Sequence, residues 1–265
     1  MAGDNTVGAL TAKLPAWLTD YVKDDQLALV ALVSTAILIV LTFYFLFKKT
    51  RGPTRDTVLI AGVSGAGKTV LYTQLRYGKT VETHTSMEKN EGRFVPFGYA
   101  RKDARPIHIV DLPGHEKLRY QYTEHASLTG RVIFVIDSTT IAREIRSVAE
   151  YLYDILANRF TQHHEIPILM VCNKSDLLMA LKPERIQALL EAEIDRLRAT
   201  RAAEVQSQGD ENDHDHEHIG RENEAFKFEH LPNPISWEAC SLIVDGVAQE
   251  GGPQAVQAFL RQLVR

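Results

Sequence analysis

Gly62-Val-Ser-Gly-Ala-Gly-Lys-Thr69 is the stretch of sequence that decides the fold, because it matches the phosphate-binding pattern G-x-x-x-x-G-K-[ST]. It follows an apolar run at 57–61 and leads into a helical pattern at 69–77. Glycines there let backbone N–H groups converge on phosphate oxygens, and the start of the next helix adds partial positive charge. We expect Lys68 to reach the β- and γ-phosphates and Thr69 to ligate Mg²⁺. The predicted nucleotide contacts are Gly62, Val63, Ser64, Gly65, Ala66, Gly67, Lys68, Thr69 and Val70.

A second element, Asp111-Leu-Pro-Gly-His115, follows the apolar run at 107–110. A carboxylate at the carboxyl end of a strand suits Mg²⁺, through an intervening water molecule. The N–H of Gly114 would lie where a γ-phosphate oxygen can accept from it, so loss of that phosphate would release the loop behind it. Two simpler readings stay open, a strand-end cap for Asp111 and an ordinary surface residue for His115.

The third element, Asn173-Lys-Ser-Asp176, predicts which base is bound. An aspartate here can accept two hydrogen bonds from the N1–H and the 2-amino group of guanine, a donor pair that adenine lacks. Charge-assisted bonds of this kind contribute roughly 1.5–3 kcal/mol each, and a site group left unpaired gives strong rejection. Asn173 would brace the loop, and the stem of Lys174 would lie over the ring. The three elements together predict GTP and GDP as ligands.

Apolar runs and helical patterns alternate along the rest of the chain. The predicted strands are 57–61, 93–99, 106–111, 132–137, 167–172 and 235–239, and the predicted helices are 69–77, 140–160, 183–203 and 253–264. This alternation predicts an α/β fold of the P-loop GTPase type, with a mostly parallel sheet covered by helices on both faces.

Residues 27–47 read LALVALVSTAILIVLTFYFLF and carry no charge. At ~1.5 Å per residue such a helix would be about 31 Å long, which matches the hydrocarbon core of a bilayer. The alternatives are a buried core helix, which would normally have a polar face, and a signal peptide, which has a shorter apolar region. We therefore expect one retained transmembrane helix.

The cations beside this segment predict its orientation. They are Lys48, Lys49, Arg51 and Arg55 after the segment, against Lys13 and Lys23 before it. The positive-inside bias places the larger, C-terminal part in the cytosol. The expected organisation is a lumenal segment at 1–26, the transmembrane helix at 27–47, a linker at 48–55 and a cytosolic GTPase domain at 56–265.

Composition narrows the remaining possibilities. The net charge is −4 at pH 7, so no global basic field favours nucleic acid, and direct nucleic acid binding is not expected. The two cysteines, Cys172 and Cys240, predict no disulfide framework and fit a reducing location. The segment 206–224 is acidic and almost devoid of apolar residues, so we expect a disordered insert. Its histidines lack the spacing of a closed zinc site.

Taken together, the three motifs resemble those of Ras-like small GTPases. More closely, the chain resembles the beta subunits of the eukaryotic signal recognition particle receptor, since a transmembrane helix leads almost directly into the GTPase domain and a histidine follows DLPG. Thr83-His-Thr-Ser-Met87 resembles the first switch of that family, and the resemblance implies that Thr85 coordinates Mg²⁺ and the γ-phosphate. Glu238-Ala-Cys-Ser-Leu242 resembles its last guanine loop, so Ser241 and Leu242 would meet the base.

The resemblance also implies a partner and a place. The partner would be the alpha subunit of the receptor, whose N-terminal domain docks on the GTP-bound switches at the endoplasmic reticulum membrane, with the ribosome or translocon nearby. The competing relatives are Arf/Sar-like GTPases that act by GTP turnover in vesicle trafficking. Residue 2 is alanine, so the myristoylation pattern of Arf-like proteins fails.

Two roles follow for the nucleotide. In the first, GTP orders a docking face and the protein is mainly a GTP-dependent binding module. In the second, hydrolysis drives each cycle. His115 bears on both, because a histidine here could orient the attacking water, as in elongation factor Tu, which the motif resembles. No residue stands out as a built-in arginine finger, and intrinsic rates without one can be as low as ~10⁻⁴ s⁻¹. We expect slow hydrolysis that resets a tether.

Overall fold

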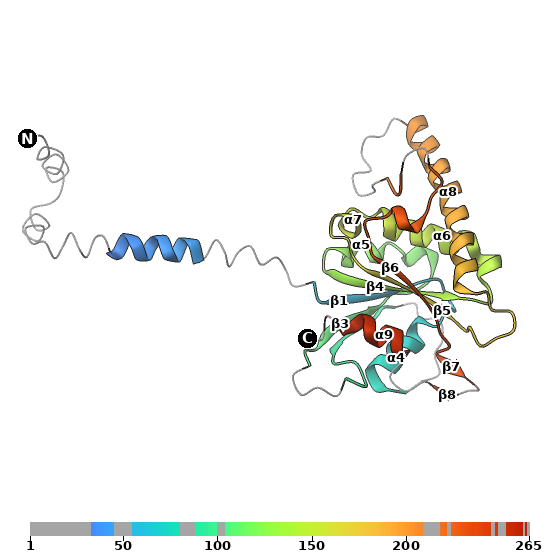
Figure 1. The fold of residues 1–265 in the computed structure, drawn as a ribbon, viewed down its shortest axis with the longest axis horizontal. Helices are drawn as coiled ribbons and strands as arrows, with labels where there is room; N and C mark the ends of the chain where they lie inside the picture. The colour runs from blue at the N-terminus through green and yellow to red at the C-terminus, as the bar shows by residue number, and fades with distance from the viewer. Residues whose placement is uncertain are drawn as a thin grey trace, which may run out of the picture. The chain divides into compact units, whose positions relative to one another are not determined.

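The computed structural model describes residues 33–44, 55–79, 88–99, 104–208, 218–221, 224–244, 247–248, 253–261 and 263. By its internal contacts the chain divides into two compact units, Met1–Thr54 and Arg55–Arg265. In the first unit, residues 33–44 form a helix (Figure 1). The side chains of this helix are exposed. Within the described ranges no helix has both the length and the apolar character needed to cross a bilayer. Both ends of the predicted span at 27–47 lie outside these ranges.

The second unit is built on a 6-stranded sheet with the order β2-β3-β1-β4-β5-β6. The strands are β1 (Thr57–Ala61), β2 (Asn90–Phe94), β3 (Ile107–Asp111), β4 (Thr129–Asp137), β5 (Ile168–Asn173) and β6 (Ile235–Ala239). Every neighbouring pair is parallel except β2 and β3, which are antiparallel. A short hairpin of β7 (Ile243–Val244) and β8 (Val247–Ala248) stands apart from this sheet. The predicted mostly parallel sheet is confirmed.

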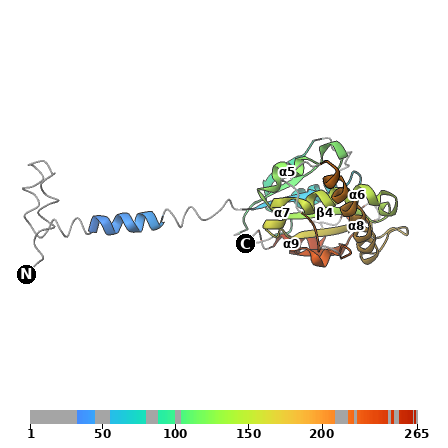
Figure 2. The same ribbon diagram turned by 90° about the horizontal axis from the view of Figure 1, so that it is seen from above.

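Helices cover both faces of the sheet, as predicted. They are α4 (Lys68–Tyr77), α5 (Gln121–Ala126), α6 (Ile141–Ala157), α7 (Arg159–His163), α8 (Pro183–Gln208) and α9 (Gln254–Leu260), with short 3₁₀ turns η2 (Glu116–Leu118) and η3 (Phe228–His230). Figure 1 shows α4 and α9 on one face of the sheet and α5 to α8 on the other, and Figure 2 views the domain from the side of α5 to α8. All residues of β1 and β5 are therefore buried, which explains their continuous apolar sequences.

The helix predicted at 140–160 is two helices. Asn158 has an extended backbone, with φ −64° and ψ 127°, and ends α6. Its side-chain oxygen accepts hydrogen bonds from the backbone N–H groups of Phe160, at 3.0 Å, and Thr161, at 3.4 Å. Asn158 is therefore an N-cap that starts α7, and the continuous helical spacing hid this break.

The strand predicted at 93–99 is also displaced. The observed strand, β2, begins at Asn90 and ends at Phe94 because its antiparallel register with β3 pairs Asn90 with Asp111 and Phe94 with Ile107. Pro96 follows, and a proline has no N–H to donate to a ladder. The polar sequence before Arg93 gave no sign that pairing would start there.

The insert predicted at 206–224 is ordered at its edges. Helix α8 continues to Gln208, and Ile219 is buried in the domain core. The carbonyl oxygens of Ile219, Arg221 and Glu224 accept hydrogen bonds from the Arg198 guanidinium of α8. The prediction of a disordered insert at 206–224 is therefore wrong at 206–208, which belong to α8, and at 218–221 and 224, where Ile219 and the bonds from Arg198 hold the chain. Residues 209–217 lie outside the described residues.

Candidate nucleotide-binding site

The phosphate-binding loop connects the carboxyl end of β1 to the first turn of α4, as the motif predicts. Lys68 is buried, and its Nζ donates a hydrogen bond of 2.8 Å to the carbonyl oxygen of Val63. Burial lowers the pKa of Lys68 to about 8, although the charge of Asp111 acts in the opposite direction. An ammonium group in such a dry setting gains from an anionic ligand, since little water competes for it.

Gly62 is needed for a steric reason. Its φ is +137°, and a Cβ atom at this position would lie 2.2 Å from the carbonyl oxygen of Val135 in β4. Gly65 offers a matched comparison, because its φ is also positive, at +79°, but a Cβ there would meet nothing within 4 Å. The two glycines thus separate backbone strain from a steric clash.

We expect Gly62→Ala to destabilise the domain by more than about 3 kcal/mol, since a β-strand backbone cannot move aside without disturbing the core. Gly65→Ala should cost about 1 kcal/mol, the usual penalty for a positive φ. Urea unfolding of both variants measures the difference. Equal losses of stability would show that contact with β4 does not constrain the loop.

Asp111 holds the centre of the site. Its Oδ2 atom accepts hydrogen bonds from Thr69 Oγ1, at 2.7 Å, and from Asn90 Nδ2, at 3.0 Å. Its Oδ1 atom is buried and has no hydrogen-bond partner within the described ranges. Burial raises the pKa of Asp111, and the bonds from Thr69 and Asn90 together with the charge of Lys68 limit the rise. A buried carboxylate oxygen without a partner, beside a threonine hydroxyl, is the donor set that Mg²⁺ takes in proteins, so these residues fit that ion.

The loop after β3 lies directly on the phosphate-binding loop. Gly114 is buried, and a Cβ atom there would lie 2.5 Å from the backbone nitrogen of Ser64 and 2.6 Å from Lys68 Nζ. Only glycine permits this approach. The two loops therefore pack closely at Gly114, while the predicted hydrogen bond from its N–H to a γ-phosphate stays a prediction.

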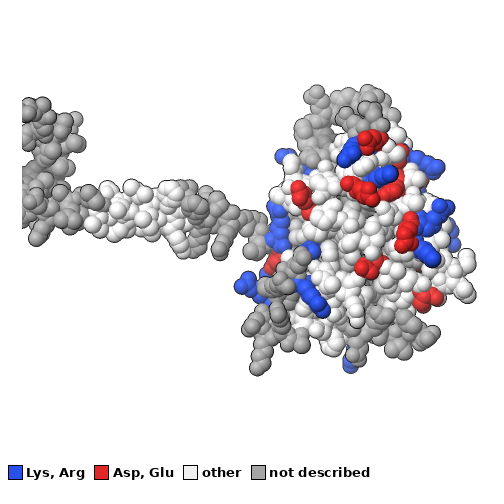
Figure 3. Space-filling view, in the orientation of Figure 1, with Lys and Arg blue, Asp and Glu red and all other residues white. Residues whose placement is uncertain are grey.

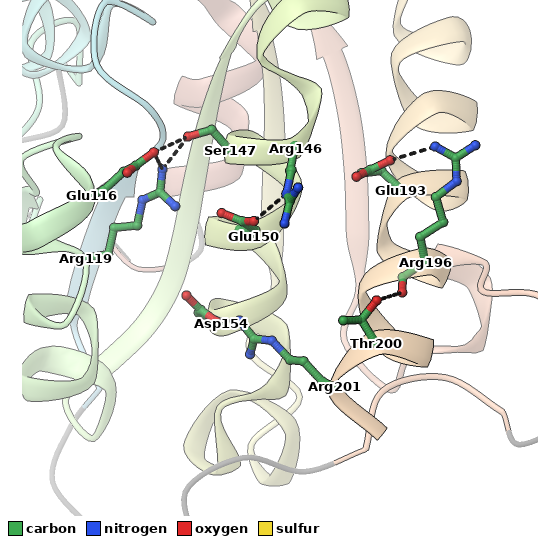
Figure 4. A network of polar contacts seen from close by, with 10 residues as sticks. All are labelled: Glu116, Arg119, Arg146, Ser147, Glu150, Asp154, Glu193, Arg196, Thr200 and Arg201. Atoms are coloured by element: carbon green, nitrogen blue, oxygen red, sulfur yellow. Dashed lines mark hydrogen bonds and ion pairs between the residues drawn. The ribbon is translucent and has the colours of Figure 1, made fainter. Parts of the chain in front are cut away.

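His115 is exposed and caps the next turn. Its Nδ1 atom accepts a hydrogen bond of 3.3 Å from the backbone N–H of Lys117, which places it at the start of η2. Just beyond that turn, Arg119 donates a 2.6 Å hydrogen bond to Ser147 Oγ of α6 (Figure 4). Arg119 also lies over the ring of Tyr151, at 5.1 Å from its centre. The loop that begins at Gly114 thus ends on a fixed helix.

The guanine motif is joined to the phosphate-binding loop by Asn173. Its Nδ2 atom donates a 2.8 Å hydrogen bond to the carbonyl oxygen of Ala66, and its Oδ1 atom accepts one of 3.1 Å from the backbone N–H of Leu242. Leu242 is buried, and its carbonyl oxygen accepts a hydrogen bond from Gln74 of α4. Three loops are therefore held at one edge of the sheet, the carboxyl ends of β1, β5 and β6.

Lys174 and Asp176 differ in how they are held. The Nζ atom of Lys174 lies 2.5 Å from Oδ2 of Asp137, at the end of β4. Burial alone would raise the pKa of Asp137, but hydrogen bonds from Lys174 and Thr139 bring it below its ordinary value. Asp176 is exposed, and its backbone N–H donates to Ser241 Oγ at 3.0 Å. The carboxylate of Asp176 is thus free to meet an incoming base from the solvent side.

Most of the predicted contact residues lie together, with two qualifications. Thr85 is outside the described residues. Leu242 braces the loop through the hydrogen bond from its backbone N–H to Asn173, and its contact with the base stays a prediction. Sequence reasoning missed Asn90 and Asp137. The role of Asp137 could have been predicted, because this residue ends the apolar strand that pairs with the strand carrying Asn173. The sequence around Asn90 offered no such indication.

The fold and these loops define the class of protein. A phosphate-binding loop after β1, DLPG after β3 and NKSD after β5, on a sheet of this order, are the arrangement of P-loop small GTPases. The family model "Signal recognition particle receptor beta subunit" matches residues 53–235. The chain belongs to that family.

Individual relatives agree with this assignment. The signal recognition particle receptor subunit beta of Rattus norvegicus is 32% identical over 244 residues, which cover 92% of this chain and 88% of the relative. The structure of the mammalian SRP receptor is similar with a TM-score of 0.61 and 28% identity, over 78% of this chain and 98% of the other. The SRb-GTP/SRX complex from Chaetomium thermophilum gives a TM-score of 0.59 and 25% identity, over 78% and 96%.

Proposed function

We propose that this chain is a GTP-dependent binding subunit of a signal recognition particle receptor, which docks the alpha subunit at the endoplasmic reticulum membrane for co-translational targeting. Family membership supports this function over that of an Arf/Sar-like GTPase in vesicle trafficking. A relative has been solved with GTP and SRX together, which supports a nucleotide-dependent partner. Proximity to the ribosome or translocon is part of the same proposal.

One observation carries the proposal. Gly114 lies so close to the phosphate-binding loop that an added Cβ would be 2.5 Å from Ser64 N and 2.6 Å from Lys68 Nζ, while Arg119, five positions later, is bonded to Ser147 of α6. The segment between them is short and lies largely at the surface. We infer that occupancy of the phosphate site alters the conformation of this surface segment, which is the property a docking switch requires.

The proposed ligand contacts follow the geometry. Lys68 and the backbone of residues 62–67 would hold the phosphates, and Asp176 would accept from guanine. Thr69 and Asp111 would hold Mg²⁺, joined by Thr85 according to the family resemblance. The metal would neutralise phosphate charge. The residues of this chain would position the phosphates, keep water away from Lys68 and present the loop after β3 to a partner.

The proposed membrane organisation rests on the sequence. We assign 1–26 to the lumen, 27–47 to one membrane crossing, 48–55 to a linker and 56–265 to the cytosol. The absence of charge over 27–47 and the excess of cations after it support this organisation.

Capture of the alpha subunit tests the function. The full chain in detergent is loaded with GTP or GDP, and the N-terminal domain of the alpha subunit is offered to each. We expect capture with GTP and loss of most capture with GDP. Equal capture with both nucleotides would contradict a nucleotide-dependent tether, and capture that needs continuous turnover would favour the hydrolysis-driven cycle.

His115 is expected to act on hydrolysis and little on binding. His115→Ala should slow single-turnover GTP hydrolysis by about 100-fold, the lower end of the usual contribution of a positioned acid–base group. The exposed ring lies outside the phosphate-binding loop, so GTP affinity should stay within about twofold. His163→Ala, at an exposed site on α7, is the control. An unchanged rate in His115→Ala would assign this histidine only its capping role.

A further inference from the structure

The edge of the sheet opposite the nucleotide loops carries a distinct set of cationic, histidine and apolar side chains. Because β1, β4 and β5 are parallel, their amino ends lie together, away from the loops that carry Lys68 and Asp176. The chain enters the domain at this edge, through Arg55. The loops before β4 and β5 also meet here. We call this surface the amino edge and define it by Arg55, Arg105, Leu128, Arg159, Phe160, His163 and His164.

A contact across three strands organises the amino edge. The guanidinium of Arg55, before β1, lies 2.5 Å from Nε2 of His164, in the loop before β5. The ring of His164 stacks on Phe160, with 6.4 Å between ring centres. Phe160 is 43% exposed and Leu128, before β4, is 47% exposed. Cationic groups and large apolar side chains therefore share one solvent-facing surface, the combination found where proteins meet the headgroup region of a bilayer.

The charge of the amino edge is mainly positive. Arg105 and Arg159 are exposed there, and so is His163. Figure 3 shows Lys and Arg side chains, with some Asp and Glu between them, along the left edge of the domain, where β1 begins in Figure 1. Among the described residues near this surface, Asp56 is paired with Arg93, whereas Glu124 and Glu165 are exposed carboxylates.

The length of the proposed linker limits how far the amino edge can lie from the membrane. The proposed linker at 48–55 is eight residues long and reaches at most about 28 Å when fully extended. It also carries Lys48, Lys49 and Arg51. If residues 27–47 cross the membrane, the amino edge is the part of the domain that is tied to the bilayer surface. Because the anchor would keep the amino edge at a high local concentration beside the bilayer, even a weak attraction between this edge and the lipid headgroups would be effective.

We propose that the amino edge docks on the headgroups of an anionic bilayer, with Arg55 and Arg159 facing lipid phosphates and Phe160 entering the interface. This inference rests on the proposed membrane anchor. Docking by this edge would leave the nucleotide loops on the side away from the lipid, open to nucleotide and to a protein partner.

Fluorescence quenching of the full chain in vesicles tests the docking. Phe160 or Leu178 is replaced by a fluorescent amino acid, and the quencher is a headgroup-labelled lipid. Leu178 is the matched probe because it is fully exposed and follows the guanine motif at the opposite edge. With phosphatidylserine in the vesicles, the probe at 160 should be quenched several-fold more than the probe at 178. In phosphatidylcholine alone, the difference should shrink.

Charge reversal separates attraction from mere tethering. Each cation near an anionic surface contributes roughly a fivefold factor, so Arg55→Glu with Arg159→Glu should remove most of the extra quenching at 160. Arg143→Glu with Arg185→Glu, on exposed residues beyond the carboxyl ends of the strands, should leave it unchanged. Flotation with the vesicles reports the anchor itself. A chain that fails to float overturns both anchor and docking, whereas a chain that floats with equal quenching at 160 and 178 overturns the docking alone.

Discussion

Replacing Lys68 with alanine is expected to weaken GTP binding by at least about 100-fold, because two charge-assisted hydrogen bonds to phosphate would be lost. In the folded chain the ammonium group is buried beside Val63 and Asp111, so water cannot take over its role. Removing it would also leave the Asp111 carboxylate without its nearby positive charge, which makes the pocket repel phosphates. Nucleotide content after purification and calorimetric titration with GTP in the presence of Mg²⁺ both measure the loss.

The matched control for Lys68→Ala is Lys182→Ala, an exposed lysine just before α8. It should bind GTP with unchanged affinity. Because Lys68 is buried, unfolding by urea must be compared as well, so that lost affinity is not mistaken for lost structure. Undiminished GTP content in a folded Lys68→Ala protein would refute the assignment of the phosphate-binding loop.

Replacing Asp176 with asparagine is expected to change the preference between guanine and xanthine nucleotides by at least about 1,000-fold. The carboxylate that would accept from two guanine N–H groups becomes an amide, which can donate to the 2-carbonyl group of xanthine. Each lost charge-assisted bond contributes roughly 1.5–3 kcal/mol, and a mismatched polar pair is penalised further. Asp176 is exposed and is held through its backbone by Ser241, so the substitution leaves the loop intact.

Competition between GTP and xanthosine triphosphate measures this change directly. Glu184→Gln is the control, since it removes an exposed carboxylate at the start of α8 without altering the guanine loop. The control should keep the guanine preference of the unmodified chain. If Asp176→Asn keeps it too, the base is read by another group and the role given to the NKSD motif is wrong.

The part of the fold that the sequence predicted best is the part with the strongest physical signal. β1 and β5 are buried on both faces and read as continuous apolar runs, so their positions were predicted closely. The glycine-rich loop could be located because its spacing of glycine and lysine is specific to phosphate binding. Each of these segments is specified by its own residues, with little help from distant parts of the chain.

Where the sequence misled, long-range pairing decided the structure. β2 is polar and takes its bounds from the antiparallel register with β3, which no local pattern reveals. Asn90 enters the site only through that register, to bind Asp111. Likewise, Asn158 looks helical in spacing and becomes a cap because the chain must turn toward β5. Ile219 is a single apolar residue in a polar segment, yet it packs in the core.

The guanidinium of Arg198 bonds to main-chain oxygens on the far side of the 209–217 segment and, with Ile219, acts as a clasp. These contacts hold the chain against α8 where the described residues resume at 218. The interval 209–217 is therefore a suitable place to graft a reporter domain within the chain. Such a graft would leave both chain ends unmodified.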